Sequence, residues 1–354
     1  MRKYILIFSI FLSCTRFIPL QPITKFSLPI CEQTNCIKIL QSENFLFEIP
    51  SEYFIKKSYL YISDSINYRI LKINKKNEIL LNITSKTQNI SDEIFSLPLK
   101  NNENLFKTFQ PGKIVIDNNE NIFVENMLAS VDEEHQDIYY SIILKFDESG
   151  KPLKIIGSKI SNNLIFPFNS IDKFSFDKEN NLFVIEKKEN NWNVYKFNEN
   201  NELITNISFN LILDKIKIST NNKIIIENLD HTADGNYLIA GINFYENDFK
   251  FLRTEFWKIG FNFEMKKIFT IKEENLSFVL VNNSDLIYLV KTEASSKEEK
   301  IIFEIFNLKG RRVSNKIIKI KIEDGKWFDT KIQKDNLITS IKIENNQFNI
   351  IEWK

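Results

Sequence analysis

Apolar and polar residues alternate along most of this chain, in short runs separated by polar turns that are rich in Asn and Asp. The segment at residues 177–197, DKENNLFVIEKKENNWNVYKF, shows the pattern: a polar turn leads into two alternating apolar runs with a loop between them. Alternation with a period of two, in residues that are often β-branched or aromatic, predicts β-strands. The sequence therefore predicts an all-β protein.

This pattern of a polar turn followed by two strands recurs along the chain. Copies begin near Asp117, Asp177, Asp234 and Asp285, and each is closed by a second apolar run. A repeat of about 50 residues that contains four short strands is typical of a β-propeller, in which each repeat forms one blade. We assign the runs to a six-bladed β-propeller over residues 43–354.

The last repeat has too few strands for a complete blade. Residues 326–333, 336–345 and 347–354 supply only three strands. A ring needs its final sheet completed, so that no strand edge is left open. We therefore expect an N-terminal strand, at residues 44–49, to become the fourth strand of the sixth blade and to close the ring.

The repeat phrase resembles that of NHL-type six-bladed propellers, in which an apolar stretch, an Asp, a Gly-Asn pair and a second apolar stretch follow one another. Residues 115–124, 142–150 and 174–184 fit best. Only Asp234, Gly235 and Asn236 keep the complete turn, because Asn or Glu mostly replaces Gly elsewhere. Together with the N-terminal residues 11–14, FLSC, the pattern is similar to propeller lipoproteins of spirochaetes, a resemblance that implies the fold and no established chemistry.

The first residues predict an export signal. Arg2 and Lys3 precede an apolar run at residues 4–12, which is too short to span a bilayer, since that needs about 20 helical residues. Residues 11–14, FLSC, resemble a bacterial lipobox, in which the Cys thiol receives diacylglycerol. We predict a lipoprotein signal peptide at residues 1–13 and a lipid on Cys14. The alternatives are a plain secretory signal and an uncleaved N-terminal segment in which Cys14 has no role.

The segment after Cys14 predicts a linker. Residues 14–42 contain several Pro residues and no sustained alternation, so we expect a tether or an edge-wrapping segment that lifts the domain off the membrane. Once Cys14 is lipidated, Cys31 and Cys36 remain as a pair, and an exported chain favours a disulfide between them. A metal site is a weaker hypothesis here, because neither His is close in sequence to these thiols.

Composition and motifs narrow the function classes. Lys plus Arg number 47 and Asp plus Glu number 46, so no overall field favours nucleic acid. No nucleophile elbow, phosphate-binding Gly loop or zinc-protease motif occurs. Gly and Pro stand at only 8 each, and we expect the abundant Asn to take left-handed turn positions in place of Gly.

Few residues carry candidate chemistry. His135 and His231 lie in acidic segments, and we expect both in solvated loops; together with Asp137 and Trp327 they are the candidate ligand contacts. The repeated Asp117, Asp177 and Asp234 are predicted to accept backbone N–H bonds in tight turns, and not to form a ring of carboxylates around a channel. We assign no catalytic residue, no metal and no particular cofactor.

The favoured hypothesis is a lipid-anchored propeller of the bacterial cell envelope, on the periplasmic face or the outer surface. It would act as a binding or scaffolding module through its rim loops and central funnel. Its partners would be the membrane, through Cys14, and an envelope protein or a host-surface ligand. The alternatives are a surface adhesin and an exported enzyme, a metal-assisted lyase or hydrolase in which His135 or His231 meets two carboxylates near the axis.

Overall fold

The computed structural model describes residues 17–31, 36–41, 47–50, 52–84, 105–106, 109–130, 139–161, 164–189, 191–217, 222–246, 250–321 and 326–354. Cys14, His135 and Asp137 lie outside these residues, as does the predicted signal peptide. Within the described part of the chain, no helix is long and apolar enough to cross a membrane.

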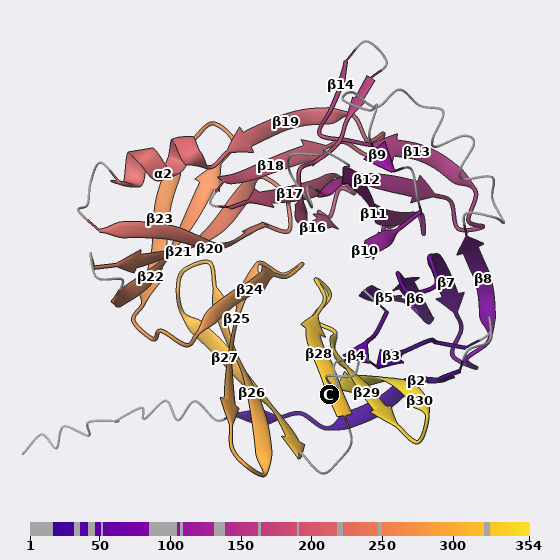
Figure 1. Ribbon diagram of the computed structural model, residues 1–354. Helices are drawn as coiled ribbons and strands as arrows, with labels where there is room; N and C mark the ends of the chain where they lie inside the picture. The colour runs from indigo at the N-terminus through magenta and orange to yellow at the C-terminus, as the bar shows by residue number, and fades with distance from the viewer. Residues whose placement is uncertain are drawn as a thin grey trace, which may run out of the picture.

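Six sheets, each built on four antiparallel strands, surround one axis (Figure 1), and two of these sheets gain a short fifth strand, β1 or β9. The fold is a six-bladed β-propeller, as the repeat pattern predicts. Blade one is formed by β5 (Glu52–Lys56), β6 (Tyr59–Asp64), β7 (Arg69–Ile73) and β8 (Ile79–Thr84); blade two by β10 (Pro111–Ile116), β11 (Ile122–Ser130), β12 (Tyr139–Phe146) and β13 (Pro152–Ile156). Blade three is formed by β16 (Ile171–Phe176), β17 (Leu182–Lys188), β18 (Asn191–Phe197) and β19 (Leu203–Ser208).

The second half of the chain continues in the same way. Blade four is formed by β20 (Lys223–His231), β21 (Tyr237–Tyr245), β22 (Phe251–Gly260) and β23 (Met265–Ile271); blade five by β24 (Ser277–Val281), β25 (Leu286–Ala294), β26 (Glu298–Asn307) and β27 (Arg312–Lys321). Blade six is formed by β28 (Lys326–Ile332), β29 (Ile338–Glu344), β30 (Gln347–Trp353) and β2 (Pro22–Pro29). The additional short strands are β1 (Ile18–Pro19), β3 (Leu40–Gln41), β4 (Phe47–Glu48), β9 (Leu105–Phe106), β14 (Lys159–Ser161) and β15 (Leu164–Phe166).

The hydrophobic core is divided among the contacts between neighbouring blades. Blades one and two share a buried cluster that includes Tyr61 and Phe146, and blades three and four share one that includes Phe183 and Phe244. Equivalent clusters join every other neighbouring pair, including blades six and one. Each blade therefore buries both faces, which fixes the position of its innermost strand relative to the next.

An N-terminal strand closes the ring, but it is not the strand expected from the sequence. β2 pairs antiparallel with β30 along its whole length, with Phe26 opposite Ile350. β1 pairs in parallel with β27 of blade five, so the same segment spans the edges of two blades. The predicted closing strand at residues 44–49 is wrong, since its described part, β4, pairs only with β3.

The boundary predicted between tether and propeller is therefore also wrong. The segment from Ile18 to Pro29 is part of the sheets, and Phe26 and Leu28 are buried in the contact between blades six and one. The expectation of an edge-wrapping segment describes it better than that of a tether. The structure contains the disulfide between Cys31 and Cys36, whose Cα atoms are 5.4 Å apart, directly after this strand.

One helix, α2 (Asn210–Lys217), connects β19 to β20. It covers the contact between blades three and four with Ile212, Leu213 and Ile216, while Leu211 remains exposed. Its apolar residues follow helical spacing on one face.

Candidate functional site

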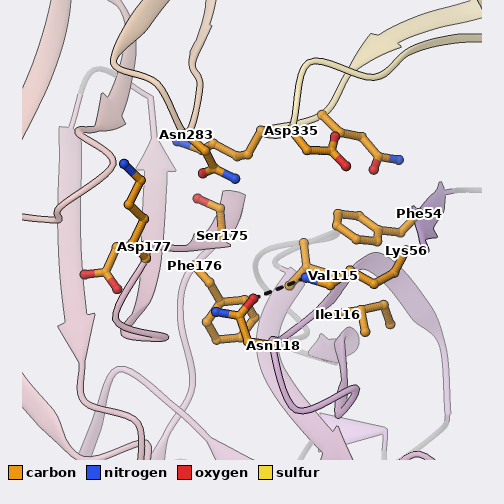
Figure 2. Close-up of a pocket in the computed structure, with 13 residues that line it drawn as sticks. Phe54, Lys56, Val115, Ile116, Asn118, Ser175, Phe176, Asp177, Asn283 and Asp335 are labelled. Atoms are coloured by element: carbon orange, nitrogen blue, oxygen red, sulfur yellow. Dashed lines mark hydrogen bonds between the residues drawn. The ribbon is translucent and has the colours of Figure 1, made fainter.

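The first strand of each blade lines a channel along the axis. Two adjoining cavities, of about 210 and about 270 Å³, share Phe54, Val115, Ser175 and Lys334 in their walls. All six innermost strands contribute to the larger cavity. Figure 2 shows the smaller one, where Phe54, Val115 and Ser175 approach the same space from three blades.

The side chains that enter the larger cavity occupy equivalent places in the blades. In blades two to six, one wall residue stands two positions before the hairpin turn that joins the first two strands, a turn marked in these five blades by the same main-chain bond. In blades two to six this place is held by Val115, Ser175, Asp230, Leu280 and Lys331. The repeat fixes where these side chains point, while their chemistry differs from blade to blade.

Bulges in the innermost strands add further side chains to the walls. The pairing of β16 with β17 shifts between Ile171 and Lys173, which leaves Asp172 without a partner residue in the ladder. Asp172 and Lys173 consequently both line the larger cavity, although they are adjacent in sequence. Bulges of this kind redirect side chains next to functional sites.

A buried ion pair crosses the channel. The carboxylate of Asp230, on blade four, accepts bonds from Lys334 Nζ at 2.6 Å and from the Val281 backbone N–H at 2.7 Å. Lys334 belongs to the turn after β28 in blade six. Burial by itself would raise the pKa of Asp230, but the ammonium groups of Lys334 and Lys173 lower it to about 2. Asp230 is therefore ionised, and the pair joins two blades that are not neighbours.

His231 is buried, and the expectation that it lies in a solvated loop is wrong. It is the last residue of β20, 1% exposed, with its ring stacked on Phe183 at 4.1 Å between centroids. Its Nδ1 lies 2.9 Å from the Thr232 carbonyl, which can only accept, so Nδ1 carries the hydrogen. Nε2 then accepts from Ser175 Oγ at 2.8 Å. Burial lowers the pKa of His231 to about 3, so the ring is neutral.

His231 therefore reaches the channel only through Ser175. Both of its ring nitrogens are engaged, which leaves neither to bind a ligand directly. Among the described residues, no three His, Cys, Asp or Glu side chains are grouped so that they could hold a metal ion.

Trp327 belongs to blade six and is not part of the cavity walls. It packs on Trp353 at 5.4 Å between ring centroids, and Lys342 Nζ lies 5.3 Å from its ring. Its indole nitrogen is buried without a hydrogen-bond partner in the part of the chain that is described. The candidate contact residues His231 and Trp327 are thus not brought together, and His135 and Asp137 are outside the described residues.

The repeated aspartates form turns, as expected. Asp117 Oδ1 accepts the backbone N–H groups of Asn119 and Asn121, and Asp177 repeats this arrangement one blade further on. Asp177 also lines the smaller cavity, as Figure 2 shows. The charged residues Lys173 and Lys334, which line the channel as well, were not predicted from the sequence. An alignment of the repeats on these turns would have found several wall residues, because in blades two to six a side chain that lines the larger cavity stands two residues before the turn.

Comparison with known proteins assigns no family to this chain. No protein-family model matches the chain, and no curated protein matches it. Solved structures similar to this chain include the Dos1 propeller, with 9% identity and a TM-score of 0.43 over 89% of this chain and 81% of that one. Streptogramin B lyase has 8% identity and a TM-score of 0.38 over 95% and 97% of the two chains. A luciferin-regenerating enzyme has 8% identity and a TM-score of 0.41 over 86% and 91%. At these identities the likeness concerns the fold alone.

Proposed function

We propose that this protein is a lipid-anchored propeller of the bacterial cell envelope that binds a small ligand in its central channel. The observation that carries the proposal is the pair of adjoining cavities on the axis, whose walls combine apolar and charged side chains from all six blades. Concave sites with a mainly apolar lining and a few placed polar groups are typical of small-ligand binding. Because each blade is held by two neighbours, such a site is formed before the ligand arrives, which lowers the cost of binding.

Filling the channel tests this proposal. Val115 lines both cavities, so Val115→Trp is expected to occupy the space that a ligand would use. We expect small molecules from a fragment library to raise the melting temperature of the wild type and not that of Val115→Trp. Leu80→Trp, at a position that is 52% exposed on the outer strand β8, is the matched control and should respond like the wild type. If the same small molecules raise the melting temperatures of Val115→Trp and of the wild type equally, they bind outside the channel and contradict the proposal.

The anchor requires a separate test. In cells fed with labelled palmitate, the wild type should carry the label and partition into detergent, whereas Cys14→Ser should do neither. The double variant Cys31→Ser, Cys36→Ser is the control, because it loses the disulfide but keeps the residue proposed to be lipidated. An unlabelled wild type would leave a plain secretory signal as the better explanation.

Which leaflet carries the protein decides between an inward-facing binding module and a surface adhesin. Protease treatment of intact cells should leave an inward-facing protein whole and should remove an adhesin. The enzyme alternative would have to use His135, which lies outside the described residues, because His231 uses both ring nitrogens inside the fold and belongs to no group of metal-binding side chains among the described residues.

A further inference from the structure

The lysines around the larger cavity differ in their partners. Lys113 has Glu125 at 3.5 Å, Lys331 has Asp329 at 2.9 Å together with Glu52, and Lys334 has Asp230 at 2.6 Å. Lys173 has no carboxylate oxygen within 4.0 Å among the described residues. Its Nζ lies 3.4 Å from the Val279 carbonyl and 5.9 Å from the centre of the Phe278 ring.

Lys173 adds an uncompensated positive charge to this part of the channel. Its ammonium lies close enough to Asp230 and Lys334 to lower the pKa of both groups. Two ammonium groups therefore lie near the one carboxylate of Asp230. That carboxylate already accepts three bonds, from Lys334 and from the backbone N–H groups of His231 and Val281. Lys173 donates one bond to a carbonyl, and an ammonium has two more N–H groups to offer.

Asp172 presents the opposite charge in the same cavity. It is half-buried, and within the described residues it forms neither a hydrogen bond nor an ion pair, Lys173 included. The bulge in β16 brings the adjacent residues Asp172 and Lys173 to the wall of the same cavity. The carboxylate of Asp172 is therefore available to a positively charged group of a ligand, with which it would form a charge-assisted hydrogen bond.

The rest of the wall is largely apolar. Phe54, Val115, Phe174 and Leu280 face the same cavity. Its volume of about 270 Å³ lies at the small end of ligand sites. An occupant of this cavity must therefore be small and must carry an apolar body.

We infer that the channel binds a small zwitterion with an apolar body, such as an apolar α-amino acid, whose carboxylate pairs with Lys173 and whose ammonium pairs with Asp172. This inference rests on the proposed function and names the class of its ligand. Each charged contact is of the charge-assisted type, which contributes more than a neutral hydrogen bond. The apolar side chain would lie against Phe54 and Leu280.

Three matched probes test the inference by calorimetry. Phenylalanine carries both charges, 3-phenylpropanoate lacks the ammonium, and 2-phenylethylamine lacks the carboxylate. We expect the wild type to bind phenylalanine at least about ten-fold more tightly than either single-charge analogue. Equal affinity for all three, or no binding of any up to about 10 mM, would overturn the inference.

Two variants should then divide the effect between the charges. Lys173→Met should lose at least about ten-fold in affinity for phenylalanine and 3-phenylpropanoate but not for 2-phenylethylamine, and Asp172→Asn should show the reverse. Lys56→Met is the control, because Lys56 lines only the smaller cavity and bonds to Asn118. Unchanged phenylalanine affinity in Lys173→Met would contradict the inference. Library hits that Val115→Trp abolishes would still support channel binding, so the two proposals can fail separately.

Discussion

At the scale of single residues, the turns show how this sequence does without glycine. The turn between the first two strands needs one left-handed residue, and blades two to six place Glu120, Asn180, Gly235, Asp285 and Asn336 there, with φ between 58° and 72°. Asn and Asp tolerate this conformation better than other residues with a side chain. Asn holds two of these five positions and Gly only one, so the expectation that Asn replaces Gly is confirmed at Asn180 and Asn336.

Some of these side chains also take part in contacts that glycine could not make. Asp285 accepts the Ala233 backbone N–H at 2.7 Å, and Asn180 accepts that of Asn118 at 3.0 Å. Each bond joins the turn of one blade to the turn of the next. Side chains at left-handed positions thus connect the blades around one mouth of the channel.

His231 gives a prediction for the pH dependence of stability. Its pKa is about 3 in the folded chain and about 6.5 when exposed, so the unfolded chain binds a proton that the folded chain does not. The contribution of His231 to stability is full above about pH 6.5 and is lost as the pH falls toward 3, at up to about 1.4 kcal/mol per pH unit. Urea unfolding of the wild type at about pH 7 and about pH 5 should show this fall.

The comparison with His231→Gln isolates this one group. His135 is present in both proteins and cancels, and carboxylates titrate mainly below about pH 5. The variant should be less stable than the wild type at neutral pH and should depend less on pH above about pH 5. Parallel pH profiles for the two proteins would show that His231 is not the group responsible.

At the scale of elements, the alternating pattern predicts most strands, and the failures have physical causes. β2 begins and ends with Pro22 and Pro29, and it contains little alternation to mark it as a strand. Pro is tolerated in an outermost strand because the N–H groups on its open side need no partner. β5 spans only Glu52–Lys56 and begins two residues after Pro50, so the pattern marks it weakly as a strand.

The cavity walls could be predicted less well than the strands. Lys173 and Lys334 belong to runs that the sequence marks only as strand and turn, and the groups around each side chain come from blades far away in the chain. Asp230 and Lys334 are separated by 104 residues, yet their atoms lie 2.6 Å apart. The pattern of a single sequence predicts the position of a side chain within its blade, but its contacts with other blades depend on how the ring closes.

The role of β2 as the closing strand can be tested on two of its side chains. Phe26 is 1% exposed in the contact between blades six and one, whereas Ile23 on the same strand is 47% exposed. Phe26→Ala should lower the free energy of unfolding by about 3–5 kcal/mol, because it leaves a cavity in that contact. Ile23→Ala should change it by less than about 0.5 kcal/mol. Similar small losses in both urea titrations would argue against closure by β2.

At the scale of the whole molecule, the Asp230–Lys334 pair ties blade four to blade six across the axis. Lys334→Met should destabilise the fold by about 3 kcal/mol, because it leaves the carboxylate of Asp230 buried without its ammonium partner. The double variant Asp230→Asn, Lys334→Met should recover much of that loss, since no buried charge is then left alone. The single variant Asp230→Asn completes the comparison. If the loss of stability in the double variant equals the sum of the losses in the two single variants, the pair is not coupled.

The way the chain enters the ring has a consequence for an anchored protein. Strand pairing begins at Ile18, four positions after Cys14, and that interval spans at most about 14 Å when fully extended. A diacylglycerol at Cys14 would therefore hold the perimeter of blades five and six against the bilayer, where Phe17, Ile18 and Val313 are exposed. Attachment would be edge-on, through the circumference of the disc, so that neither opening of the channel is the point of attachment.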